Sequence, residues 1–144
     1  MIKHLSVTEA QQQQHAGTPY VDVRSVPEFQ QAHPSGAYNI PLLHLDPRTG
    51  QMRPNDEFVA VVRATFAPDT PLLLGCQAGV RSLQACELLA AAGYTNVTNV
   101  RGGFGGSRQG DVGWMQAGLL VETAPAEGRD YAALQKKATG STRA

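Results

Sequence analysis

Short apolar runs alternate with segments of helical periodicity along the chain. The apolar runs lie at residues 3–6, 20–23, 37–40, 72–74 and 97–100, and the helical patterns at 8–14, 25–33, 55–66, 81–92 and 131–137. An alternation of this kind is typical of an α/β domain whose strands pair in parallel. The pattern therefore predicts one mostly parallel sheet covered by helices.

Several helix boundaries are marked by polar residues and breakers. Thr8 is the predicted cap of the first helix, and Ser25 is the predicted cap of the second. Pro27 suits a first helical turn, and Glu28 stands three residues after Ser25, as in a capping box. Residues 44–50 contain a proline and a glycine and are predicted to form a loop.

Composition narrows the class of protein. A chain of 144 residues fits one domain, and its 12 basic and 12 acidic side chains cancel, which gives no electrostatic reason to expect nucleic acid or a membrane surface as a partner. No run approaches the ~20 apolar residues of a membrane span, and the first residues lack the apolar stretch of a signal peptide. We therefore expect a cytoplasmic protein whose two cysteines are thiols.

The most informative stretch surrounds Cys76. The apolar run 72–74 leads through a glycine to Cys76, and a helical pattern begins at Arg81. Ligands of parallel sheets bind at the carboxyl ends of strands, so the position suits a site. A helix N-terminus and a nearby arginine favour the thiolate, which is the nucleophilic form of cysteine. Gly79 lets the loop curl, and Arg81 either anchors the loop or binds an anionic substrate.

The length of this loop separates two chemistries. A cradle of amides above a cysteine suits phosphatases, which form a phosphocysteine, and sulfurtransferases, which form a persulfide. Cysteine-dependent phosphatases place five residues between cysteine and arginine, whereas four residues separate Cys76 from Arg81 here. The shorter loop favours sulfur over phosphate.

Four ordered motifs resemble the rhodanese family of sulfurtransferases. The resemblance rests on V-D-V-R with E-F at residues 21–29, H-P-S-G-A-Y-N-I-P-L at 33–42, the Cys-x4-Arg loop, and residues 94–103 followed by Trp114 and Gly118. It covers a domain at residues 1–123 and leaves a polar tail at 124–144 with one short helix. It implies an α/β fold with a five-stranded, mainly parallel sheet and helices on both faces.

The resemblance also implies a mechanism and a set of site residues. Cys76 would take a sulfane sulfur from a donor such as thiosulfate and pass it to cyanide, a cellular thiol or a protein persulfide partner, without metal or organic cofactor. The residues implied to bind substrate are those of the loop: Gln77, Ala78, Gly79, Val80, Arg81 and Ser82. Asp22 and Arg24 are expected to brace the sheet beside the loop.

Some features depart from the family pattern or have simpler interpretations. Gln77 and Ala78 are neutral where thiosulfate-specialised members tend to be basic, and residues 104–113 form a long glycine-rich loop that we expect to be flexible and to line the pocket. Cys86, which falls on an apolar helix face, is predicted to be a core residue. Two alternatives stay open: a persulfide carrier or non-catalytic module specific for a protein partner, and a small cysteine-dependent phosphatase or arsenate reductase.

Overall fold

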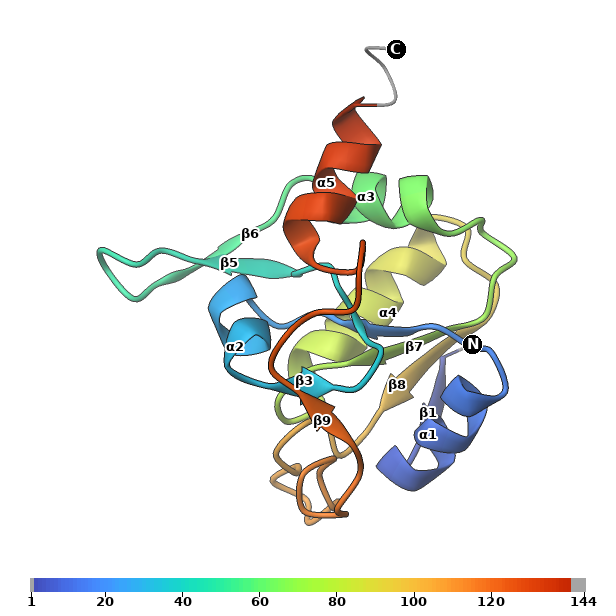
Figure 1. Cartoon of the computed structure of the whole chain (residues 1–144). Helices are drawn as coiled ribbons and strands as arrows, with labels where there is room; N and C mark the ends of the chain where they lie inside the picture. Colours follow the sequence, from blue (N-terminus) through green and yellow to red (C-terminus); the bar gives the residue numbers. More distant parts are fainter. Residues whose placement is uncertain (1, 141–144) are drawn as a thin grey trace.

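Five parallel strands form the central sheet of the computed structural model, which describes residues 2–140 (Figure 1). Their order across the sheet is β1 (Lys3–Leu5), β8 (Val97–Val100), β7 (Leu72–Gly75), β2 (Tyr20–Asp22) and β4 (Tyr38–Asn39). Every pairing in this sheet is parallel, with Leu74 opposite Val21 on one side and Asn99 on the other. The predicted α/β architecture is confirmed.

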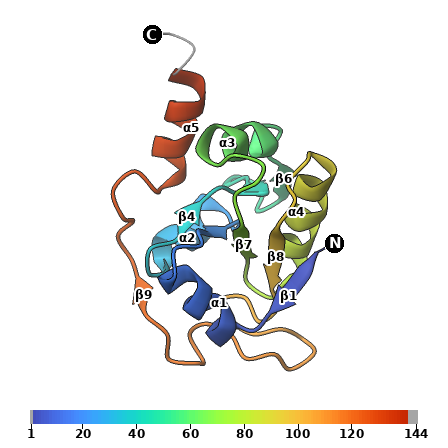
Figure 2. The ribbon, with the colours of Figure 1, turned by 90° about the vertical axis from the view of Figure 1, so that its right-hand side faces the viewer.

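The strand side chains alternate between two apolar layers. Leu72 and Leu74 pack in one layer with α3 (Phe58–Thr65), α4 (Val80–Ala91) and α5 (Tyr131–Gly140). Leu73 packs in the other layer, with α1 (Val7–His15), α2 (Val26–Gln31) and Trp114. Figures 1 and 2 show α1 and α4 on opposite sides of β8. Because both faces are covered, the strand β7 that precedes Cys76 is fully buried.

The first helix begins earlier than the sequence analysis predicted. Ser6, not Thr8, is its N-cap: the Ser6 hydroxyl accepts a hydrogen bond from the Glu9 amide at 3.2 Å, and the Glu9 carboxylate accepts one from the Ser6 amide at 3.0 Å. This is a complete capping box, which satisfies two amides of the first turn, whereas Thr8 lies inside the helix.

The loop predicted at residues 44–50 was only partly right. It is the tip of an antiparallel hairpin formed by β5 (Leu43–Leu45) and β6 (Met52–Pro54). Residue Asp46 closes the tip, since its carbonyl accepts from Gly50 and its amide donates to Gln51, both at 2.8 Å. A second small pairing, of β3 (His33–Pro34) with β9 (Val121–Glu122), was also not predicted.

The helix predicted in the polar tail is present as α5 and packs against α3. Tyr131 and Leu134 are buried in the core, and the Tyr131 hydroxyl accepts a hydrogen bond from Asn55 at 3.1 Å. The tail ends at residue 144, and its residues 141–144 lie outside the described part, as does residue 1. Within residues 2–140, no helix is both long and apolar enough to cross a bilayer.

Candidate active site

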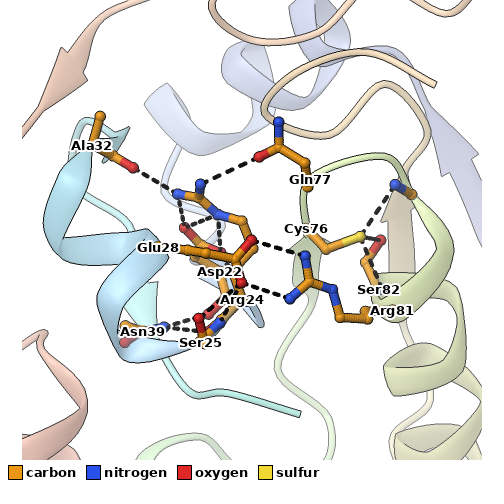
Figure 3. A network of polar contacts seen from close by, with 11 residues as sticks. Asp22, Arg24, Ser25, Glu28, Ala32, Asn39, Cys76, Gln77, Arg81 and Ser82 are labelled. Atoms are coloured by element: carbon orange, nitrogen blue, oxygen red, sulfur yellow. Dashed lines mark hydrogen bonds and ion pairs between the residues drawn. The ribbon is translucent and has the colours of Figure 1, made fainter. Parts of the chain in front are cut away.

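Cys76 lies directly after β7, where a loop of residues 76–79 leads into α4. Its side chain is 2% exposed, and its sulfur accepts hydrogen bonds from the amides of Gly79 at 3.1 Å and Ser82 at 3.3 Å (Figure 3). The Ser82 hydroxyl stands 3.3 Å from the same sulfur. Amides that point at a sulfur from a helix N-terminus stabilise negative charge on it.

The tight curl of this loop depends on Gly79. Its φ of 91° lies in the left-handed region, and a Cβ at this position would stand 2.5 Å from the carbonyl oxygen of Arg101. Both observations favour glycine, because other residues rarely adopt this backbone conformation and a side chain would collide with the following segment. Gly79 is therefore needed to aim its own amide at Cys76.

Arg81 anchors the loop through a bidentate ion pair. Its guanidinium donates to the two carboxylate oxygens of Glu28 on α2, at 2.7 and 3.0 Å. Burial raises the pKa of Glu28, but hydrogen bonds from Arg81 and Ser25 outweigh that effect and lower the pKa to about 2. Of the two roles expected for Arg81, the structure shows the anchoring arrangement. Glu28 was predicted only as a capping residue, and it serves both purposes.

Asp22 and Arg24 form a buried ion pair beside the loop. Arg24 Nη2 stands 2.8 Å from Asp22 Oδ2, and both side chains are at most 4% exposed. Burial lowers the pKa of Arg24, but the charge and hydrogen bonds of Asp22 more than offset this and raise it. Arg24 also donates to the carbonyl of Ala32 at 2.7 Å and to the side chain of Gln77 at 3.5 Å (Figure 3). Arg24 thus links the ion pair to the start of the loop that follows Cys76.

The glycine-rich segment supports the loop from outside. The amides of Phe104 and Gly105 donate to the carbonyls of Cys76 and Gln77 at 2.7 and 3.0 Å. A Cβ on Gly103 would stand 2.6 Å from the Cys76 carbonyl oxygen, so this approach needs glycine. A cavity of about 520 Å³ opens here, lined by Arg24, Glu28, Gln31, Ala32, Gln77, Phe104 and Met115.

The remaining loop residues differ in their surroundings. Gln77 and Val80 are exposed, and Ala78 is half-buried. A second cavity, of about 440 Å³, is lined in part by Ala78, Val80 and Arg101. The predicted loop residues therefore gather around Cys76, but only the Gly79 and Ser82 amides and the Ser82 hydroxyl hydrogen-bond its sulfur.

Asn99 is a site residue that the sequence analysis missed. It lies on β8, is 4% exposed, and accepts a hydrogen bond from the Ser82 hydroxyl at 2.6 Å. The sequence contained a feature that could have identified it, because Asn99 is a polar residue near the carboxyl end of a predicted buried strand, and binding sites of parallel sheets form at that end. Its contact with Ser82 depends on β8 pairing with β7, which the sequence order alone does not reveal.

Three conspicuous side chains outside the loop are structural. Cys86 is fully buried, and desolvation raises the pKa of its thiol to about 12. His33 is buried and stacks on Phe29, with 3.6 Å between ring centroids. Trp114 is buried in the core beside Tyr20. Over residues 2–140 we find no cluster of three histidine, cysteine, aspartate or glutamate side chains that could hold a metal ion.

Comparisons with known proteins agree with this geometry. The rhodanese-like domain profile matches residues 6–108. The chain is 36% identical to the senescence-associated protein DIN1 of Raphanus sativus over 117 residues, which are 81% of this chain and 58% of that protein. It is 37% identical to the chloroplastic thiosulfate sulfurtransferase 16 of Arabidopsis thaliana over 100 residues, which are 69% of this chain and 82% of that protein.

A solved structure shows the same fold. The crystal structure of Rv0390 from M. tuberculosis superposes with a TM-score of 0.70 at 25% identity, and the alignment covers 85% of this chain and 98% of that one. The profile match includes the loop that holds Cys76 and the strands on both sides of it. The chain therefore belongs to the rhodanese-like domain family.

Proposed function

We propose that the chain is a sulfurtransferase that carries a sulfane sulfur as a persulfide on Cys76. The observation that carries the proposal is the arrangement of the Gly79 and Ser82 amides around the Cys76 sulfur at a helix N-terminus. The name of the Arabidopsis relative, a thiosulfate sulfurtransferase, supports the same reaction class. The loop is too short for the five-residue spacing of phosphatases, so we do not propose phosphate or arsenate chemistry.

The proposed reaction has two displacement steps. The Cys76 thiolate attacks the outer sulfur of thiosulfate, a new S–S bond forms, and sulfite leaves with the electron pair of the broken S–S bond. Cyanide or a thiolate then attacks the outer sulfur of the persulfide, and the Cys76 thiolate departs with the electron pair. Amides of the loop between Gln77 and Ser82 would stabilise the negative outer sulfur.

A protein persulfide donor is the second candidate, and the charges around the loop favour it over thiosulfate. Both arginines near Cys76 are already paired, Arg24 with Asp22 and Arg81 with Glu28, and Gln77 and Ala78 are neutral. A small dianion therefore meets little uncompensated positive charge at the loop.

A cytoplasmic location is also part of this proposal and is supported by the two free thiols. The Arabidopsis relative, in contrast, is named chloroplastic.

A turnover assay tests the proposed function. Wild-type protein should convert thiosulfate and cyanide to sulfite and thiocyanate, Cys76→Ala should abolish turnover, and Cys86→Ala should retain it. A protein persulfide offered as donor should be used faster than thiosulfate if the second candidate holds. Wild-type protein that accepts sulfur from neither donor would contradict both forms of the proposal.

A further inference from the structure

A row of hydrogen-bonding groups leads from Cys76 to the surface. The Cys76 sulfur lies 3.3 Å from the Ser82 hydroxyl, which lies 2.6 Å from the side-chain oxygen of Asn99. The amide nitrogen of Asn99 lies 3.4 Å from Nδ1 of His4 on β1, an exposed residue. Ser82 and Asn99 are at most 4% exposed, so water does not compete freely for these bonds.

The hydroxyl of Ser82 has one hydrogen and two possible acceptors. Either atom of the 3.3 Å contact between Cys76 and Ser82 could donate; with the hydroxyl hydrogen in the shorter contact to Asn99, at 2.6 Å, the thiol proton is left to donate to the Ser82 oxygen. This arrangement suits a neutral sulfur. After the thiol proton leaves to solvent, the two amides still donate to the sulfur, and the Ser82 hydroxyl adds a third donor only by giving up Asn99.

We propose that the Ser82 hydroxyl is a two-position switch, with Asn99 as the positioning residue that turns it away from Cys76 and His4 as the group that orients the Asn99 amide. With neutral sulfur, the hydroxyl donates to Asn99. With a thiolate, it donates to Cys76. Asn99 therefore competes with Cys76 for the hydrogen of the Ser82 hydroxyl.

The switch also has a role in the proposed transfer cycle, and this part of the inference rests on the proposed function. In a persulfide the Cys76 sulfur is neutral and the charge lies on the outer sulfur. The Ser82 hydroxyl then returns to Asn99, which accepts its hydrogen. When sulfur leaves and the thiolate reappears, the hydroxyl turns back to Cys76. Ser82 thereby stabilises the leaving thiolate at the step that produces it.

In the proposed switch, His4 selects which end of the Asn99 amide faces Ser82, because its Nδ1 lies 3.4 Å from the Asn99 amide nitrogen. A ring nitrogen that accepts from the Asn99 amide nitrogen leaves the amide oxygen directed at Ser82. With the amide turned over, an N–H would face Ser82, and the hydroxyl would be left to donate to Cys76. Loss of His4 therefore acts in the same direction as loss of the Asn99 oxygen, but more weakly, because the amide is then free in both orientations.

Charged and titratable groups around the row must be held constant in a test. Tyr20, Arg81 and Cys86 interact electrostatically with Cys76 from β2 and α4. The Asp22–Arg24 and Arg81–Glu28 pairs face the same loop. Near His4, Arg101 donates to the His4 carbonyl and pairs with Asp111. The variants below leave all of these groups in place.

The test is a titration of the Cys76 thiolate by its ultraviolet absorbance, which needs no sulfur transfer. Cys86, with a pKa of about 12, stays silent over most of the range. Asn99→Leu removes the acceptor, and we expect the titration midpoint to fall by about one pH unit. His4→Ala should lower it by a fraction of that amount, while His15→Ala, an exposed histidine on α1, should leave it unchanged.

A double variant decides whether Ser82 transmits the effect. In a Ser82→Ala background, Asn99→Leu should no longer shift the midpoint, and a shift of equal size there would overturn the proposal. If Asn99→Leu does not fold, Asn99→Ala removes the same acceptor and carries the same expectation. An unshifted midpoint in a folded Asn99 variant would also overturn it. A protein that shows the shift but transfers no sulfur would contradict only the proposed function.

Discussion

Cys76 and Cys86 stand ten positions apart in the sequence, at the entrance to α4 and within it, and differ in almost everything but burial. Their side chains are 2% and 0% exposed. The Cys76 sulfur faces two amides and a hydroxyl, whereas burial raises the pKa of Cys86 to about 12. Burial alone makes a cysteine inert, whereas burial among converging N–H donors suits the nucleophile that we propose Cys76 to be.

Among the variants that test the contrast between Cys76 and Cys86, Gly79→Ala is expected to have the largest effect on sulfur transfer. Alanine would be strained at a φ of 91°, and its Cβ would stand 2.5 Å from the Arg101 carbonyl oxygen, so the loop would shift and its amide would leave Cys76. We expect sulfur transfer to fall by about a hundredfold. Steady-state kinetics on the purified variant measure this.

Gly50→Ala is the matched control for that variant. Gly50 also has a positive φ, of 72°, but a Cβ there meets no atom within 4 Å. It should lose some stability, about 1 kcal/mol, and keep full activity. Equal activity losses in both variants would show that backbone strain, and not the position of the Gly79 amide, explains the effect.

A smaller effect is expected from loosening the anchor with Glu28→Gln. The pKa of Glu28 is about 2 in the folded chain, against an ordinary 4.5, so its ion pair with Arg81 stabilises the fold above pH 4.5 and is lost as pH falls toward 2. After allowance for solvent screening, we expect a loss of about 1–2 kcal/mol at neutral pH. Denaturant unfolding at several pH values checks this.

The variant should also flatten the acid limb of the stability profile, because glutamine does not titrate. Glu9→Gln alters the other capping box, where the exposed Glu9 carboxylate accepts a hydrogen bond from the Ser6 amide at 3.0 Å, and it should change stability less. Transfer activity should fall severalfold in Glu28→Gln and stay constant in Glu9→Gln. An identical response of the two variants would mean that Glu28 acts as a cap alone.

The smallest effect on transfer is expected at Cys86. Cys86→Ser places a hydroxyl in the apolar cluster and should cost about 1–3 kcal/mol of stability, whereas Cys86→Ala should cost less. Neither variant should change the rate of transfer per folded molecule. A Cys86→Ala protein with a large loss of activity but normal stability would give Cys86 a chemical role and remove the contrast with Cys76.

The sequence predicted features that are local in the chain. The apolar run before Cys76, the capping box of Ser25 and Glu28, and the core position of Cys86 each follow from spacing within a few residues, and each is present. The Thr8 cap was wrong although the better box, Ser6 with Glu9, has the same spacing as the one at Ser25. Spacing within a few residues was therefore enough to locate these features, including the cap at Ser6 that the choice of Thr8 overlooked.

The features that were missed depend on contacts between distant segments. The ion pair of Arg81 with Glu28 spans 53 positions, and the bond from Ser82 to Asn99 requires that β8 lie beside β7. The hairpin of β5 and β6 is local in the chain and was missed for another reason: its second strand is exposed and ends in a proline, so the segment shows little apolar alternation. Strand order and backbone pairing, which hydropathy does not encode, supply these contacts.

The position of the transferred sulfur tests the account most directly. Protein incubated with thiosulfate, or with a protein persulfide, is digested without reductant, and the masses of its cysteine-containing peptides are measured by mass spectrometry. We predict one added sulfur on the Cys76 peptide, none on the Cys86 peptide, and none on either in Cys76→Ala. Sulfur on Cys86, or no adduct on Cys76 with either donor, would contradict it.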